Sequence, residues 1–117
     1  MLPMQHQMQL QPNPFFKIKN GSKVIEQRLN DEKRQLIKIG DEIEFYLATD
    51  PTQKIMTAVE DLYHFPTFKD LCYAFLPALY GGLDREEYVD MYQYYSQVDE
   101  AKYGVLGIRI RVQEREL

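Results

Sequence analysis

The stretch GSKVIEQR, from Gly21 to Arg28, holds three ionic side chains whose order guides the interpretation of the whole chain. Side chains alternate between the two faces of a strand, so a strand over residues 23–29 places Glu26 and Arg28 on one face. Lys23 belongs to the other face, although the preceding turn can swing it toward the same space. The stretch is therefore either a solvated strand with an ion pair worth about 0–1 kcal/mol, or a set of ionic groups around a ligand.

The residues before this stretch predict one strand and one short helix. Met8 and Leu10 alternate with glutamines, which is typical of a half-buried strand. Asn13 is a suitable cap for a helix with Pro14 at its first position, and Asn20 and Gly21 supply a left-handed stop.

The residues after it predict a hairpin and a final strand. A helical turn is expected over residues 32–37, followed by an amphipathic strand over residues 42–47. Residues 54–65 are rich in β-branched and aromatic side chains, so we expect them to pair back on that strand. Residues 108–112 alternate apolar and basic side chains and predict the last strand.

Three capping patterns predict helices in the second half of the chain. Thr67 with Asp70 starts a helix whose apolar spacing runs over residues 68–79, with Pro77 ending or bending it. Asp84 with Glu87 starts the next helix, and Ser96 with Asp99 starts a turn that stops at residue 104. The tyrosine-rich stripe of Tyr88, Met91, Tyr92 and Tyr95 on the middle helix is expected to be core or interface rather than a stacking platform.

Charge is distributed unevenly along the chain. The formal net charge is -4, yet residues 17–38 hold seven lysines and arginines against three carboxylates, a local balance of +4 that leaves -8 for the rest. Coating a phosphate backbone requires many cations acting together. We therefore expect a localised anion such as a nucleotide or a short RNA, with a solvated charged turn as the alternative.

Length and composition predict one globular domain in the cytoplasm. The 117 residues suffice for one core, no run of about 18 apolar residues is present, and the first residues lack the layout of a signal peptide. Cys72 is the only cysteine, and His6 and His64 lie in no metal-binding spacing. No membrane association, disulfide, structural metal or cofactor is expected, and carboxylates remain the only candidates for holding a catalytic metal.

Residues 8–45, MQLQPNPFFKIKNGSKVIEQRLNDEKRQLIKIGDEIEF, resemble the start of an ASCH domain, the family named for homology to activating signal cointegrator 1. Its hallmark, GxKxxExR, corresponds to Gly21, Lys23, Glu26 and Arg28. The strand start at residues 40–41 and the closing KYGVLGIRI extend the similarity to roughly residues 6–112, within a single domain of residues 1–117. The resemblance implies an α+β fold, a small PUA-like β-barrel closed by several helices, which would also remove exposed strand edges.

The resemblance also implies that Lys23, Glu26 and Arg28 line a cleft that binds RNA or a modified nucleoside or nucleotide. Lysine and arginine suit phosphate or carbonyl oxygens, and a carboxylate accepts from an exocyclic amine. Tyr46 or Tyr63 is expected to supply an aromatic face for stacking. Glu60 and Asp61 are candidates for the cleft or for a solvated strand edge.

Two other functions remain open. Some small ASCH members hydrolyse N4-acetylcytidine with the hallmark lysine, a threonine three residues later and a distant glutamate. Here Glu26 stands at the position of that threonine, so an amidohydrolase acting on N4-acetylcytidine-type nucleosides would use Lys23 and Glu26 as acid and base. The second alternative is a protein-interaction module with exposed tyrosines. Cys72 is expected to be a buried small hydrophobe, and His64 a hydrogen-bonded structural histidine.

Overall fold

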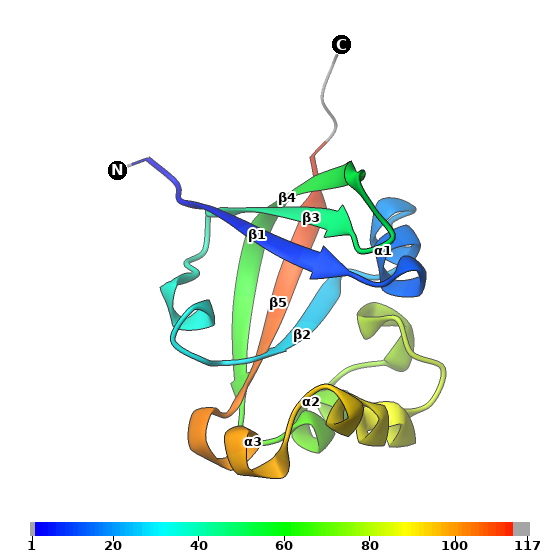
Figure 1. Ribbon diagram of the computed structural model, residues 1–117. Coiled ribbons are helices and arrows are strands. Elements are labelled where there is room, and N and C mark those ends of the chain that lie inside the picture. The colour runs from blue at the N-terminus through cyan, green and yellow to red at the C-terminus, as the bar shows by residue number, and fades with distance from the viewer. Residues whose placement is uncertain (1, 114–117) are drawn as a thin grey trace.

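Five strands form one curled sheet around the core (Figure 1). This computed structural model describes residues 2–113. The strands lie in the order β1-β3-β4-β5-β2. Their bounds are β1 (Gln5–Leu10), β2 (Ile25–Leu29), β3 (Glu42–Leu47), β4 (Asp50–Phe65) and β5 (Val105–Val112).

The long strand β4 joins the two halves of the sheet. Its first part pairs antiparallel with β3 and its second part pairs antiparallel with β5. β1 adds to β3 in parallel, and β2 adds to β5 antiparallel. The sheet curls into a half-barrel whose two edge strands, β1 and β2, are not joined by a backbone ladder within residues 2–113. The prediction of an α+β fold with a small barrel-like sheet and several helices is confirmed.

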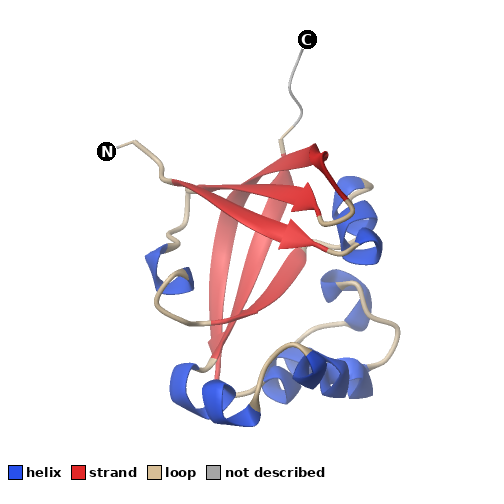
Figure 2. Ribbon diagram, viewed as in Figure 1, coloured by secondary structure: helices blue, strands red, loops and turns tan. Residues whose placement is uncertain are grey.

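In the view of Figure 2, helices lie to the left and right of the sheet and below it. Helix α1 (Pro12–Lys19) connects β1 to β2, and the short 3₁₀ helix η1 (Arg34–Leu36) precedes β3. The connection from β4 to β5 forms a helical segment, residues 66–104, that gathers below the sheet in this view. It holds α2 (Phe68–Ala74), η2 (Pro77–Tyr80), η3 (Arg85–Gln93) and α3 (Gln97–Tyr103).

The apolar side chains form two clusters. The sheet cluster fills the half-barrel with residues from β1, α1, β3, β4 and β5, among them Phe15, Phe45 and Ile108. The helical cluster lies between the helical segment and the sheet, and is built around Ile25, Phe68 and Leu71 with partly buried tyrosines packed against it. The expectation that the tyrosine stripe would contribute to packing is confirmed, because Tyr88, Met91, Tyr92 and Tyr95 all join the helical cluster.

Most predicted elements are present, with boundary corrections. Helix α1 begins at Pro12 after the capping residue Gln11, so the prediction of Asn13 as the cap was wrong. The helix could start earlier because Pro12 itself occupies the first helical turn, where its missing N–H costs nothing. β2 begins at Ile25, which leaves Lys23 outside the strand.

The first helix of the second half is shorter than predicted. The capping by Thr67 is confirmed, because its side chain accepts a hydrogen bond from the Asp70 N–H, but α2 ends at Ala74. Leu76 is extended, as expected for a residue before proline, and is 66% exposed. The capping box at Asp84 is also confirmed, although the helix it starts is the 3₁₀ helix η3. No helix among the described residues is long and apolar enough to cross a membrane.

Candidate functional site

A pocket of about 290 Å³ opens where the edge strands β1 and β2 face each other. We call it the seam cleft. The helical segment supplies its third wall, through the last residues of η3 and those just after it. Its lining residues are Gln9, Leu10, Gln11 and Pro14 from β1 and α1, Lys23, Glu26, Gln27 and Arg28 around β2, and Met91, Tyr94 and Tyr95.

Three ionic side chains, those of Lys23, Glu26 and Arg28, meet in this cleft. Nζ of Lys23 lies 2.8 Å from Oε1 of Glu26, and Nη2 of Arg28 lies 2.9 Å from Oε2. Nε of Arg28 also donates to Oε2 at 3.1 Å, and the backbone N–H of Gln27 donates to Oε1 at 3.1 Å. Both carboxylate oxygens therefore already accept two hydrogen bonds each, and Glu26 holds the two cations in place.

The electrostatics of the trio favour the fully charged state. Glu26 is only 4% exposed, and burial acts to raise its pKa. The charges of Lys23 and Arg28 and their hydrogen bonds outweigh burial and lower the pKa of Glu26 from 4.5 to about 2. Burial acts to lower the pKa of Arg28, but the charge of Glu26 and its hydrogen bond raise it. The Glu26 carboxylate is therefore ionised at neutral pH and lies between the side chains of Lys23 and Arg28.

The turn between α1 and β2 explains how Lys23 reaches Glu26. Gly21 has a φ of 84°, in the left-handed region that ends the helix. The Asn20 side chain accepts from the Ser22 N–H, and the Lys23 N–H donates back to the Lys17 carbonyl. The side chain of Lys23 thus enters from the turn and not from a strand face, so alternation does not apply to it.

Arg28 also connects the two edge strands. Its Nη2 donates to the backbone carbonyl of Gln9 at 2.8 Å. This contact spans from β2 to β1, where the sheet lacks a backbone ladder. The guanidinium is therefore part of both the ionic trio and the closure of the half-barrel.

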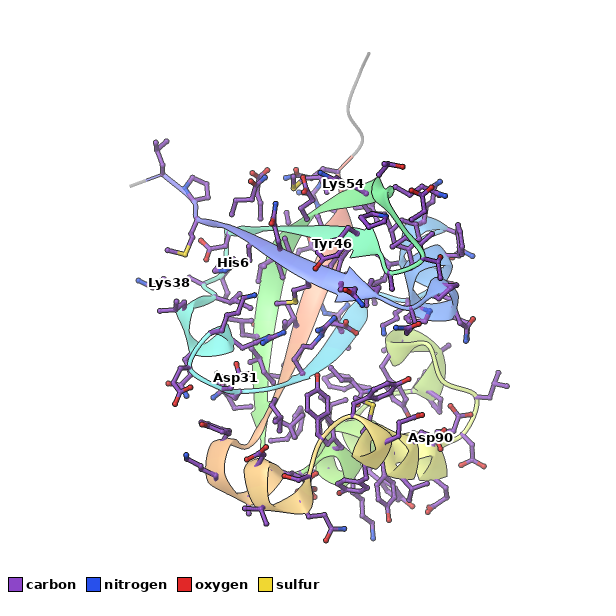
Figure 3. The ribbon with its side chains drawn as sticks, viewed as in Figure 1. His6, Asp31, Lys38, Tyr46, Lys54 and Asp90 are labelled. Carbon is purple, nitrogen blue, oxygen red and sulfur yellow. The ribbon has the colours of Figure 1, made fainter. Side chains whose placement is uncertain are left out.

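The tyrosines of the cleft are not those that the sequence suggested. Tyr46 lies on β3, on the side of the sheet away from the helical segment (Figure 3). Tyr63 packs against Phe75, and its hydroxyl accepts from Nε of Arg109 at 2.9 Å. Neither lines the seam cleft, whereas Tyr94 and Tyr95 do. Sequence reasoning missed their role because only the packing of residues 66–104 against the sheet brings them to β2.

Other candidate residues lie elsewhere. Glu60 lines a second pocket of about 230 Å³, and Asp61 lines neither of the two. His64 is exposed, so the prediction of a hydrogen-bonded structural histidine was wrong. Cys72 is 1% exposed, which confirms its prediction as a buried residue. Among residues 2–113, no group of three or more His, Cys, Asp or Glu side chains is placed to hold a metal ion.

A buried pair of His6 and Asp41 has no counterpart in the sequence prediction. Nε2 of His6 lies 2.9 Å from Oδ2 of Asp41, and the Asp41 carboxylate also accepts from the backbone N–H groups of Met4 and Lys38. The pair ties the start of β1 to the loop before β3, at the other end of β1 from the seam cleft. The partners are 35 positions apart in the sequence, and no local pattern signals their contact.

Comparison with known proteins gives two groups of similar structures. No family model matches the sequence, and no curated protein matches it. The crystal structure of hypothetical protein PH0355 is 35% identical, with a TM-score of 0.82, and the match covers 94% of this chain and 100% of that one. Protein PF0455 from Pyrococcus furiosus is 30% identical, with a TM-score of 0.72, and the match covers 96% of this chain and 100% of that one.

The second group consists of ASCH structures. The ASCH protein from Zymomonas mobilis is 16% identical, with a TM-score of 0.64 over 90% of this chain and 65% of that one. Its serine-to-alanine variant gives a TM-score of 0.67, and the match covers 94% of this chain and 70% of that one. At this identity the similarity concerns the fold, and it agrees with the architecture described above.

Proposed function

We propose that this chain, which has the fold of the ASCH structures, belongs to the ASCH-domain family and that its seam cleft binds RNA or a modified nucleoside through Lys23, Glu26 and Arg28. The observation that carries the proposal is the meeting of these three side chains with Tyr94 and Tyr95 in one pocket. Cations that contact oxygen atoms and rings that stack on a base are the two elements common to RNA-binding sites. We also propose that the similarity over residues 6–112 belongs to a single ASCH domain and that this domain functions in the cytoplasm.

The proposal assigns different roles to the three ionic residues. Lys23 and Arg28 contact the ligand, because each has N–H groups beyond those used on Glu26. Glu26 positions them, because its oxygen atoms are already engaged. Tyr94, which is 63% exposed, offers a ring face at the mouth of the cleft.

The geometry favours binding over amide hydrolysis. A general base works best when its pKa lies near the working pH. Glu26, with a pKa of about 2 and four hydrogen bonds, is a weak base for activating water. An amidohydrolase using Lys23 and Glu26 as acid and base is therefore the less favoured candidate. The protein-interaction alternative rests on Tyr73 and Tyr94, which are exposed on the helical segment.

An amide NMR titration of labelled protein with short single-stranded RNA and a panel of modified cytidines tests the proposal. Saturable shifts are expected at residues 23–28 and 91–95. Lys23→Gln and Arg28→Lys should weaken affinity about 10- to 100-fold, the effect of losing one or two charge-assisted hydrogen bonds. Arg28→Lys keeps the charge beside Glu26 and so protects the fold.

Lys54→Gln is the matched control, because Lys54 is exposed near the β3–β4 turn, away from the cleft (Figure 3). Unchanged affinity in both cleft variants contradicts the proposal. Release of cytidine from N4-acetylcytidine during the titration, abolished by Lys23→Gln, supports the amidohydrolase instead.

A further inference from the structure

The ionic trio leaves the cleft with one net positive charge. Lys23 and Arg28 each carry a positive charge, and Glu26 cancels one of them. The Lys23 ammonium has three N–H donors and uses one on Glu26 within the described part of the chain. Arg28 contacts Glu26 and Gln9 through Nε and Nη2, and its guanidinium is also within hydrogen-bonding reach of the Tyr95 side chain. The remaining donors suit one anionic group.

Lys23 lines the second pocket as well, and the seam cleft is the one of the two pockets that both cations line. The side chains of Lys23 and Arg28 are 8% and 14% exposed. An anion that contacts both must therefore enter the pocket and cannot approach across an open surface. The volume of about 290 Å³ lies at the lower end of the range for small-molecule pockets, roughly 300–1,000 Å³. Such a space suits one nucleotide and not a run of them.

The wall formed by the helical segment repels further phosphates. Residues 84–100, which include η3 and the start of α3, hold six carboxylates and one arginine. The exposed Asp90 directly precedes the cleft residue Met91 and lies on the helical segment in Figure 3. Like charges oppose one another over about 10 Å at ordinary salt. The carboxylates of residues 84–100 therefore repel the phosphates of a polynucleotide that extends from the cleft on this side.

We propose that the seam cleft selects a single nucleotide carrying one phosphate, held by Lys23 and Arg28 with its base against Tyr94 or Tyr95, and that residues 84–100 disfavour longer RNA. This inference rests on the proposed function and narrows its ligand class. Glu26 is a positioning residue in this arrangement, and Asp90 is a specificity-determining residue.

Calorimetric titration separates the ligand classes. The probes are the four ribonucleosides, their 5′-monophosphates and oligonucleotides of two, four and eight units of the base that binds best. A monophosphate should bind about ten-fold more tightly than its nucleoside, and affinity should not rise with chain length. The slope of log affinity against log salt concentration should stay near -0.7, the value for about one phosphate contact on a single strand.

One charge variant tests the role of the acidic wall. Asp90→Asn should raise the affinity of the eight-unit oligonucleotide about two-fold at low salt and leave the monophosphate unchanged. Glu42→Gln is the control, because Glu42 pairs with Gln5 at the end of β1 away from the cleft residue Gln9. The control variant should change neither affinity.

Two results overturn the inference while leaving the proposed function intact. One is affinity that increases with RNA length together with a steeper salt slope, which indicates a track of several phosphate contacts. The other is a nucleoside that binds as tightly as its monophosphate. If none of these probes binds but a modified cytidine does in the NMR titration, the inference fails and the proposed function stands; if nothing binds in either experiment, both fail.

Discussion

Glu26 is the residue on which both cations of the seam cleft depend. It is buried and accepts hydrogen bonds from Lys23, Arg28 and the Gln27 backbone. A buried charge is costly unless it is paired, and removing one partner leaves the others uncompensated. The same carboxylate therefore contributes to the stability of the domain and to the shape of the cleft.

Glu26→Gln should lower the free energy of unfolding by about 3–5 kcal/mol at pH 7, because it leaves two buried cations without their counter-charge. Urea denaturation measures the loss. Glu42→Gln should stay within about 0.5 kcal/mol of the original protein. If Glu26→Gln lowers the free energy of unfolding no more than Glu42→Gln does, Glu26 is not the counter-charge on which Lys23 and Arg28 depend.

The pH dependence provides an independent readout of the same residue. The pKa of Glu26 is lowered in the folded state to about 2, from 4.5. A carboxyl group with a lowered folded pKa contributes stability above its unfolded pKa, and this contribution is lost as the pH falls toward the folded value. The difference in stability between the original protein and Glu26→Gln should therefore shrink between about pH 4.5 and pH 2.

The sequence predicted that Glu26 and Arg28 lie on the same face of a strand. It did not predict which tyrosines lie beside them. The spacing of Glu26 and Arg28 follows from strand alternation, which is a local property. Alternation placed Lys23 on the opposite face, because the strand was predicted two residues too long, whereas the preceding turn was expected to be able to swing it toward Glu26. Tyr94 and Tyr95 reach the cleft through contacts between distant segments, and one sequence carries no local signal for such contacts.

At the scale of elements, Gly81 shows how the helical segment fits over the cleft. Its φ is 85°, and a Cβ there would lie 2.9 Å from Cδ of Lys23. Its carbonyl also accepts from Nζ of Lys17 at 2.8 Å. The end of η2 therefore packs directly on the side chain of a cleft residue, and only glycine leaves room for this contact without backbone strain.

Gly81→Ala should cost about 1–2 kcal/mol of stability from its left-handed backbone and should also displace Lys23. Gly21→Ala is a close control, because Gly21 has a φ of 84° and nothing within 4 Å of a Cβ. Both variants should lose similar stability in urea denaturation. Only Gly81→Ala should shift the side-chain NMR signals of Lys23, and equal shifts in the two variants contradict the packing argument.

Element boundaries were predicted where a capping side chain marks them. Thr67, Asp84 and Ser96 each accept a backbone hydrogen bond at the start of a helix, as their spacing indicates. The end of α2 and the 3₁₀ geometry of η3 were not predicted, because the same apolar spacing suits either helix type. The fold itself was identified from a resemblance, since alternation alone specifies strands but not their order in the sheet.

At the scale of the whole molecule, the two apolar clusters differ in burial. The sheet cluster is made largely of fully buried side chains from β1, β3, β4 and β5. The helical cluster relies on partly buried tyrosines, and η3 contributes no buried residue. Regions with few buried contacts open at lower free energy than the core.

Amides of η3 should therefore exchange with solvent at a free energy several kcal/mol below that of amides in β4 and β5. Native-state hydrogen exchange in low denaturant measures both sets in one sample, with Ile108 and Ile110 in β5 as internal references. Equal protection of the η3 amides and the β4 and β5 amides contradicts the view that the helical cluster is less stable than the sheet cluster. Because η3 forms one wall of the seam cleft, its opening would also expose the ionic trio.

The contact between Arg28 and the Gln9 carbonyl has a practical consequence for finding the natural ligand. A compound bound between β1 and β2 contacts both edge strands of the half-barrel. Because these strands lie together only in the folded protein, the compound binds the folded chain alone. Mass action then raises the melting temperature by an amount that grows with the ratio of ligand concentration to Kd, whatever the chemistry of the compound. A thermal-shift screen of a metabolite library can thus rank candidates with no substrate assay, and Arg28→Lys serves as the counter-screen that removes compounds acting elsewhere.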